Sequence, residues 1–200
     1  RAFLALARAP EAPRAHRFTR EEYARMGESG VFRDGRVELL DGEVIATSPQ
    51  GPAHASGVQT LARRLERLIG DRFCIRCQLP IALDAWSEPE PDVAVCHQVA
   101  DNYSREHPRP AEVCWLIEVA DSSLRFDRQN KGSLYARAGI EDYWIVNLVD
   151  RVLEVYRLPG PVPSALYGRH YRSAVTLAPP AVVVPLAFAS VRIAVADLLP

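Results

Sequence analysis

Two carboxylates stand in stretches of sequence that are otherwise apolar. Asp92 opens the run PDVAVC, residues 91–96, and Glu118 interrupts the run VCWLIEV, residues 113–119. A charged side chain within such a strand is costly to bury without a partner, and a divalent cation is the obvious partner for carboxylate oxygens. Lys131 follows on a predicted helix that leaves the second strand. These three residues are therefore candidates for a reactive site.

Lys131 is the only lysine in the chain, because the other 23 of the 24 basic residues are arginines. A compositional bias that removed lysine elsewhere has left it here, which indicates a need for a compact ammonium group that arginine cannot supply. The alternative is the chance survival of one lysine on a solvated helix face, since most surface charges are simply solvated. Composition alone does not favour one interpretation over the other.

The three candidates suit metal-assisted hydrolysis if Asp92 and Glu118 meet at neighbouring strand ends. Their oxygens, with a backbone carbonyl such as that of Val119, would hold Mg²⁺ or Mn²⁺, ions that keep bound waters. Such an ion lowers the pKa of a bound water and polarises a phosphoryl oxygen. Lys131 could orient the attacking water or stabilise the developing negative charge. Phosphodiester hydrolysis fits this set, and so do other metal-dependent hydrolyses.

The bulk composition is typical of one globular domain. Two hundred residues with 48% hydrophobic content supply an ample core, and a net charge of −1 gives no general attraction for polyanions. No apolar run reaches the roughly 18 residues of a membrane span, so no membrane association is predicted. We expect a flexible leader over residues 1–15 and a single domain over residues 16–200. Cys74 and Cys77 lack a second metal-binding pair, so we expect reduced cysteines and a cytoplasmic protein.

Hydrophobic periodicity and turn signals predict alternating helices and strands. Helices are expected over residues 19–26, 53–69 and 124–138, with a short helical turn over 194–199. Besides the two acid-bearing strands (the second over 112–119), strands are expected over residues 36–40, 43–47, 73–83, 142–148, 152–158, 171–177 and 181–184. Helices placed between groups of strands indicate an α/β (α+β) domain, with a mixed β-sheet flanked by helices and β-hairpins at both ends.

Four further polar residues accompany the three candidates. Glu38 shares a strand face with a leucine, which places it at a site or simply on a half-exposed face. His54 lies in the first turn of the helix over 53–69, where the helix dipole is positive. Asp127 and Tyr135 lie four residues before and after Lys131, so all three share a helix face.

Several of these segments resemble a known family. Asp92 after a proline, followed by Glu118 in LIEV, resembles the PD-(D/E)xK nuclease signature. More narrowly, the chain resembles the restriction-endonuclease-like Uma2 family, also known as DUF820. The resemblance is carried in order by VELLDGE (37–43) with His54, by EPDVAV (90–95), by IEVADSS (117–123) with the helix behind it, and by GIEDYWIV (139–146).

The resemblance implies a restriction-endonuclease-like fold and metal-dependent DNA cleavage. By residue, it implies that Asp92 and Glu118 are the metal ligands, that Lys131 is the catalytic lysine and that Glu38 is a further acidic site residue. It gives His54, Asp127 and Tyr135 supporting roles. In the broad nuclease pattern the lysine lies two residues after the second acid, but that position is Ala120 here, so Lys131 must reach back from the following helix.

Two other hypotheses compete with a nuclease. The chain could be a nuclease-fold protein that no longer cuts and acts as a nucleic-acid-binding or assembly module, because it lacks a separate DNA-reading segment. It could also be a structural domain in which Arg125 or Arg128 neutralises the buried acids without any metal. A homodimer would allow symmetric cutting of two strands, although nothing in the sequence establishes the stoichiometry.

Overall fold

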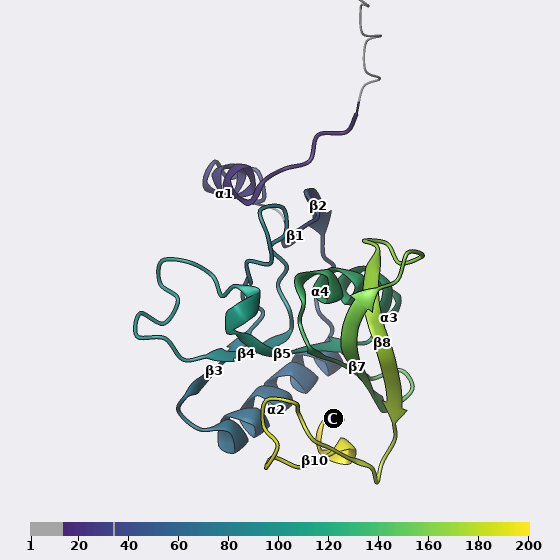
Figure 1. Ribbon diagram of the computed structural model, residues 1–200. Coiled ribbons are helices and arrows are strands. Elements are labelled where there is room, and N and C mark those ends of the chain that lie inside the picture. The colour runs from purple at the N-terminus through teal and green to yellow at the C-terminus, as the bar shows by residue number, and fades with distance from the viewer. Residues whose placement is uncertain (1–13, 34) are drawn as a thin grey trace, which may run out of the picture.

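The computed structural model describes residues 14–33 and 35–200 (Figure 1). The predicted leader over residues 1–15 lies almost entirely outside the described residues. The remaining chain forms a layered α+β structure, as the sequence predicts.

The helices and strands follow one another in mixed order. The helical segments are α1 (Arg20–Glu28), α2 (Pro52–Ile69), η1 (Pro110–Glu112), α3 (Leu124–Phe126), η2 (Asp127–Lys131), α4 (Gly132–Ala138) and η3 (Val195–Asp197). The strands are β1 (Val37–Leu40), β2 (Glu43–Ala46), β3 (Phe73–Cys77), β4 (Val93–His97), β5 (Val113–Ala120), β6 (Asp142–Asn147), β7 (Val152–Pro161), β8 (Arg169–Leu177), β9 (Val182–Val183) and β10 (Ile193–Ala194).

Six strands form the central sheet in the order β3-β4-β5-β6-β7-β8. Only the β5–β6 pair within this sheet is parallel, and the others are antiparallel. A parallel pair needs a crossover connection, and here the crossover consists of α3, η2 and α4. The candidate lysine therefore lies on the crossover that follows the strand carrying Glu118.

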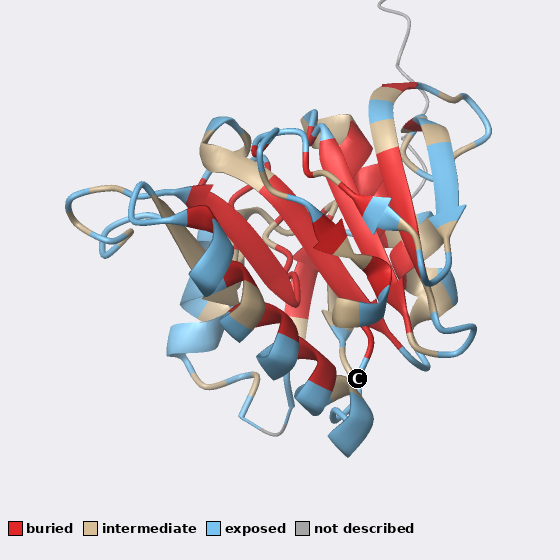
Figure 2. Ribbon diagram, turned by 90° about the horizontal axis from the view of Figure 1, so that it is seen from below, coloured by how far each residue is buried: buried red, intermediate tan, exposed pale blue. Residues whose placement is uncertain are grey.

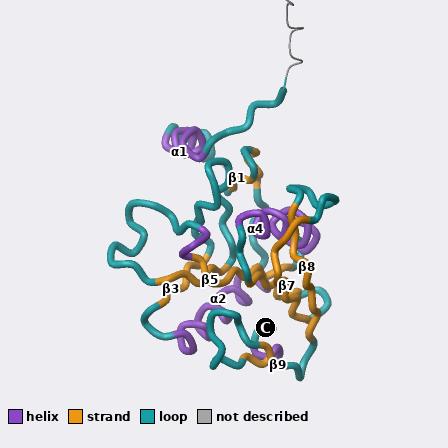
Figure 3. Tube along the Cα trace, viewed as in Figure 1, coloured by secondary structure: helices purple, strands orange, loops and turns teal. Residues whose placement is uncertain are grey.

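Each face of the sheet buries a separate apolar cluster, and Figure 2 shows that the strands of the sheet are largely buried. Helix α2 and the C-terminal segment that contains β9 and β10 cover one face, where the core residues include Val58, Leu61, Leu65, Ile117, Trp144 and Val195. Helix α4 covers the other face, with Leu116, Leu134, Ala136, Tyr143 and Ile145 in its core. The tube in Figure 3 shows strands between the two helical layers. Strands buried on both sides read as continuous apolar runs, which is why the acids in β5 and before β4 are conspicuous.

The predicted strand over residues 73–83 is too long. Strand β3 ends at Cys77, and Gln78 adopts a left-handed conformation with φ of 53°. Pro80 then lacks the N–H that a strand ladder needs. Several other strands are correct in place but differ in length, because β7 extends to Pro161 and β8 begins at Arg169.

The single helix predicted over residues 124–138 is instead a broken one. Its middle part, η2, is a π-helical turn between the short α3 and α4. Hydrophobic periodicity does not distinguish a π turn from an α turn over so few residues. Gly139 ends the segment in the left-handed conformation, with φ of 83°, which glycine adopts without a steric penalty.

None of the helices among the described residues is long and apolar enough to cross a membrane.

Gly57 lies in α2 where that helix crosses β5, close to the candidate acids. A Cβ atom at this position would lie 3.0 Å from Cγ1 of Val119. We therefore expect Gly57→Val to destabilise the protein by about 1–3 kcal/mol through overpacking, measured by urea denaturation. Ala55→Val on the exposed face of the same helix is the matched control and should change stability by less than about 0.7 kcal/mol. Equal effects of the two substitutions would contradict close packing of α2 on β5.

Candidate active site

A cleft of about 270 Å³ opens between the β1–β2 hairpin, the start of α2 and the segment that contains η2. Its lining includes six of the seven polar residues singled out in the sequence, namely Glu38, His54, Asp92, Glu118, Asp127 and Lys131. The seventh, Tyr135, is fully buried and contacts Glu118. Residues far apart in the chain thus meet in one place.

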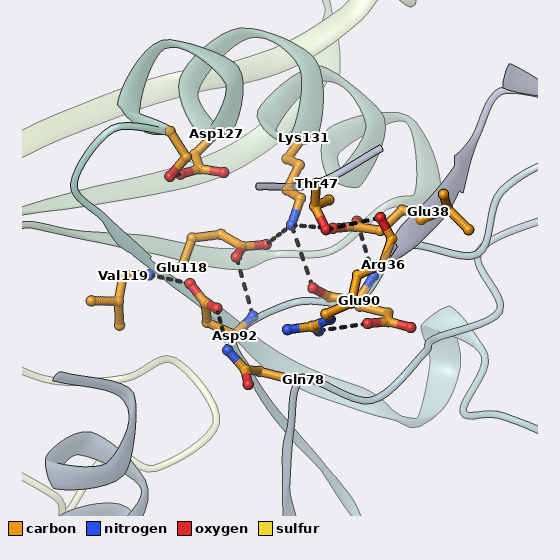
Figure 4. A network of polar contacts seen from close by, with 12 residues as sticks. Arg36, Glu38, Thr47, Gln78, Glu90, Asp92, Glu118, Val119, Asp127 and Lys131 are labelled. Carbon is orange, nitrogen blue, oxygen red and sulfur yellow. Dashed lines mark hydrogen bonds and ion pairs between the residues drawn. The ribbon is translucent and has the colours of Figure 1, made fainter. Parts of the chain in front are cut away.

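Asp92 and Glu118 are brought together by strand register. Val93 pairs with Ile117 across the antiparallel β4–β5 ladder, so the residues one step further along, Asp92 and Glu118, lie opposite each other. Two reciprocal hydrogen bonds link them (Figure 4): the Asp92 amide donates to Glu118 Oε2 at 3.1 Å, and the Val119 amide donates to Asp92 Oδ2 at 2.8 Å. The backbone therefore orients both carboxylates.

Lys131 reaches these acids from the crossover helix. Its Nζ lies 3.1 Å from Glu118 Oε1 and 3.4 Å from Glu38 Oε1, and it donates to the Glu90 carbonyl at 3.4 Å. Figure 4 shows the ammonium between the two glutamates. Lys131 therefore approaches Glu118 from the crossover helix and not from strand β5.

The remaining predicted residues support this arrangement from several elements. Glu38 Oε2 accepts the Glu90 amide at 3.1 Å, so Glu38 is buried and not half-exposed. Tyr135 donates its hydroxyl to Glu118 Oε1 at 2.7 Å. His54 Nε2 lies 2.9 Å from Asp92 Oδ2.

Negative charge exceeds positive charge in this cleft. Four buried carboxylates, Glu38, Asp92, Glu118 and Asp127, have exposed fractions of 6%, 8%, 1% and 3%. One buried ammonium, that of Lys131 at 5% exposure, accompanies them, with the half-buried imidazole of His54 beside Asp92. Because burial disfavours isolated charges, such a set requires either protons or a cation.

The pKa shifts follow from this excess. Burial raises the pKa of Glu118 well above its usual range, although Lys131 acts against this, and burial raises the pKa of Asp127 to about 6. Burial would also raise the pKa of Asp92, but the hydrogen bond from His54 and the charge of Lys131 outweigh it and lower that pKa.

The two basic groups also titrate away from their ordinary values. Burial alone would lower the pKa of Lys131, yet Glu118 and Glu38 raise it above the usual lysine value. The hydrogen bond to Asp92 raises the pKa of His54. Lys131 is therefore a firmly protonated ammonium at neutral pH.

The contacts of Glu90, Gln78 and Ser123 with the site were not predicted from the sequence. Gln78 Nε2 donates to Asp92 Oδ1 at 3.2 Å, and Ser123 Oγ donates to Asp127 Oδ2 at 2.5 Å. Gln78 follows Cys77, which pairs with Val93, so the β3–β4 register places it opposite Asp92. That register cannot be read from the sequence, where Gln78 falls inside an apparently continuous strand.

The structural hypothesis based on arginine is wrong for the two residues it names. Arg128 pairs with Glu154 on β7, and Arg125 Nε donates to Gln129 Oε1 at 3.3 Å. Neither arginine forms an ion pair with the cleft carboxylates among the described contacts. Lys131 is the cation that pairs with Glu38 and Glu118.

The donor set can accept a hard divalent cation. A carboxylate offers about four acceptor sites, and Asp92 and Glu118 each accept three of the bonds described above, which leaves one site on Asp92 Oδ1 and one on Glu118 Oε2. Within residues 14–33 and 35–200, no three His, Cys, Asp or Glu side chains form a metal-binding group. Two carboxylates and solvent ligands suit Mg²⁺ or Mn²⁺ better than a metal enclosed by protein ligands.

Comparison with known proteins gives two matches. Residues 20–196 match the model of the Uma2 family, described as "Putative restriction endonuclease". Among solved structures, the chain is similar to a "putative nuclease belonging to DUF820" from Anabaena variabilis ATCC 29413, with 18% sequence identity and a TM-score of 0.66. That match covers 90% of this chain and 97% of the other, and at this identity it shows a common fold. No curated protein matches the chain.

The charge of Asp127 should make stability depend on pH. Its carboxyl titrates near 3.8 when unfolded and near 6 when folded, so the folded state binds more protons between these values and stability falls as pH rises through that range. Asp127→Asn removes this pH-dependent loss of stability. We expect the free energy of unfolding of the variant, relative to that of wild type, to rise by on the order of 2 kcal/mol from pH 4 to pH 7.5. Urea denaturation in EDTA measures this difference. A difference that is independent of pH would contradict the assignment.

Proposed function

Because the chain belongs to the Uma2 family, we propose that it is a metal-dependent endonuclease that hydrolyses phosphodiester bonds in DNA. One observation carries the proposal: a buried ammonium, Lys131, lies 3.1 Å from Glu118 in a cleft that it shares with Asp92 and in which carboxylates outnumber cations. The nuclease fold of the solved relative supports the same class of reaction.

Asp92 and Glu118 would hold Mg²⁺ or Mn²⁺ through their two remaining acceptor sites, with a backbone carbonyl such as that of Val119. Such an ion, when bound, lowers the pKa of a coordinated water and polarises a phosphoryl oxygen. The reciprocal backbone hydrogen bonds keep both carboxylates oriented before any ligand arrives. This preorganisation lowers the cost of reorganisation at the moment of reaction.

Lys131 supplies positive charge where negative charge develops during phosphoryl transfer. Its raised pKa keeps the ammonium protonated, so it acts as an electrostatic group and hydrogen-bond donor and not as a general base. Glu38 and the Glu90 carbonyl hold Nζ from the side away from Glu118. Tyr135 orients Glu118, and His54 orients Asp92.

DNA is the substrate that we propose, as the family's description implies a restriction enzyme. The net charge of −1 provides little long-range attraction for DNA, so binding would depend on contacts around the cleft and on the bound cation. We further propose that the protein acts as a homodimer in the cytoplasm, because two symmetric sites can cut both strands of a duplex.

The central test is cleavage of plasmid DNA with Mg²⁺ or Mn²⁺. Asp92→Asn and Lys131→Met keep side-chain volume and should each lower the cleavage rate by at least about 100-fold. Glu66→Ala, on the exposed face of α2, is the control and should cleave as wild type does. Asp92→Asn and Lys131→Met must each retain a cooperative melting transition, which shows that they fold. If the wild type binds DNA without cutting any substrate, the protein is instead an inactive nuclease-fold binding module.

Metal binding can be tested without catalysis. Mn²⁺ should raise the melting temperature of the wild type, because a ligand that binds only the folded state stabilises it. Glu118→Gln removes one negative ligand, so the Mn²⁺-induced rise should fall to less than half. Asp101→Asn, in a surface loop outside the cleft, is the control and should keep the full rise. An equal rise for wild type and Glu118→Gln would refute the proposed ligand set.

A further inference from the structure

The π-helical turn η2 carries Asp127 and Lys131 into the cleft. The Gly132 amide donates to the Asp127 carbonyl, five residues back, and also to the Gln129 carbonyl, so the turn is wider than an α-helical one. Residues spaced four apart, such as Asp127, Lys131 and Tyr135, would share a face of a regular α-helix as well. The π turn therefore does not create their shared face, but it sets the angle between Asp127 and Lys131 around the helix axis.

Two side chains from the sheet bind the backbone of this turn. Tyr143 on β6 donates its hydroxyl to the Asp127 carbonyl at 3.0 Å. His170 on β8 lies with Nε2 2.9 Å from the Arg128 carbonyl, and because a carbonyl only accepts, this nitrogen carries the proton. The Asp127 carbonyl already accepts the Gly132 amide, and its second lone pair accepts the Tyr143 hydroxyl. Tyr143 and His170 thus bind the carbonyls of two consecutive residues of the turn.

Other contacts tie the same segment to neighbouring strands. Arg128 Nε donates to Glu154 Oε2 on β7 at 2.9 Å. Ser133 Oγ donates to the Arg169 carbonyl at the start of β8, at 2.7 Å. Gly132 makes the close approach of β8 feasible, because a Cβ atom there would lie 3.1 Å from His170 Nε2. Three successive strands thus hold one turn of helix.

We propose that Tyr143 and His170 are positioning residues, which hold the π register of η2 through its backbone carbonyls and so place the Lys131 ammonium between Glu38 and Glu118. In the described contacts neither residue touches a carboxylate group of the cleft, since Tyr143 meets only the backbone carbonyl of Asp127, so their effect passes through the backbone of η2. The placement of Lys131 is independent of catalysis, while its consequence for cleavage rests on the proposed nuclease function.

The single lysine provides a direct readout. Protein labelled with ¹⁵N-lysine should give one side-chain ammonium signal, from Lys131, visible because buried ammonium protons exchange slowly with water. Tyr143→Phe removes only the hydroxyl oxygen and keeps the ring. We expect this variant to shift the signal toward that of free lysine and to broaden it. Tyr171→Phe is the matched control, since its buried hydroxyl has no hydrogen-bond partner among the described residues; its spectrum should equal that of wild type.

His170 provides the second pair of variants. His170→Phe keeps a ring but loses the donor, and should shift and broaden the Lys131 signal as Tyr143→Phe does. His170→Gln restores an N–H donor of similar reach and should retain the wild-type signal. An unchanged signal in both Tyr143→Phe and His170→Phe overturns the proposal. So does an equal shift in Tyr171→Phe, or a failure of His170→Gln to restore the signal.

The kinetic consequence is tested separately. We expect His170→Phe to lower kcat by about 10- to 100-fold, as displacement of a catalytic group by about 1 Å does, with KM changed by less than about twofold because the lining of the cleft is intact. If wild type itself does not cleave DNA, the nuclease proposal fails and the ammonium spectra still decide the positioning role. If wild type cleaves but the spectra of the variants match that of wild type, the positioning role fails alone.

Discussion

The burial of one ammonium among four carboxylates is the interaction on which the site depends. Without Lys131, Glu118 and Glu38 would remain buried with no partner charge. Removal of one partner from a buried ion pair is strongly destabilising. Yet one ammonium does not balance four acids. The remaining carboxylates therefore need either protons or a further positive charge to offset the cost of their burial.

The arrangement of strands and the crossover brings Asp92, Glu118 and Lys131 together in this cleft. Strand β5 and the residue before β4 supply Glu118 and Asp92, and their antiparallel register places the two opposite each other. The parallel β5–β6 pair requires a crossover on one face of the sheet, and that crossover carries Lys131. The lysine thus comes from the crossover and not from strand β5, and its Nζ lies 3.1 Å from Glu118 Oε1.

A lysine on a helix needs more support than one on a strand. In a strand, register alone determines which face a side chain occupies; in the crossover, the register of η2 has to be held separately. Three strands contact η2: β6 through Tyr143, β7 through Glu154, which binds Arg128, and β8 through His170. These strands lie on the side of the sheet away from Asp92 in the strand order, so both halves of the sheet serve the same cleft.

Much of this protein can be deduced from its sequence. The apolar runs identify β4 and β5, and the unexpected acids in them identify Asp92 and Glu118, because an unpaired charge in a buried strand is costly. The lone lysine and the spacing of Asp127, Lys131 and Tyr135 indicate one helix face. The hairpin at Asp41-Gly42 and the amphipathic pattern of α2 are equally local signals. Each of these depends on residues that are close together in the chain.

Other features of the site depend on contacts between residues that are distant in sequence, so only the tertiary structure reveals them. The early end of β3, which brings Gln78 to Asp92, depends on the pairing of β3 with β4. The choice between half-exposed and buried positions for Glu38 depends on Lys131, which lies more than ninety residues later. The π turn in the crossover depends on donors from β6 and β8. Local sequence specifies which residues can do chemistry, whereas long-range contacts decide where their atoms lie, since register and helical phase are set by partners that local periodicity does not contain.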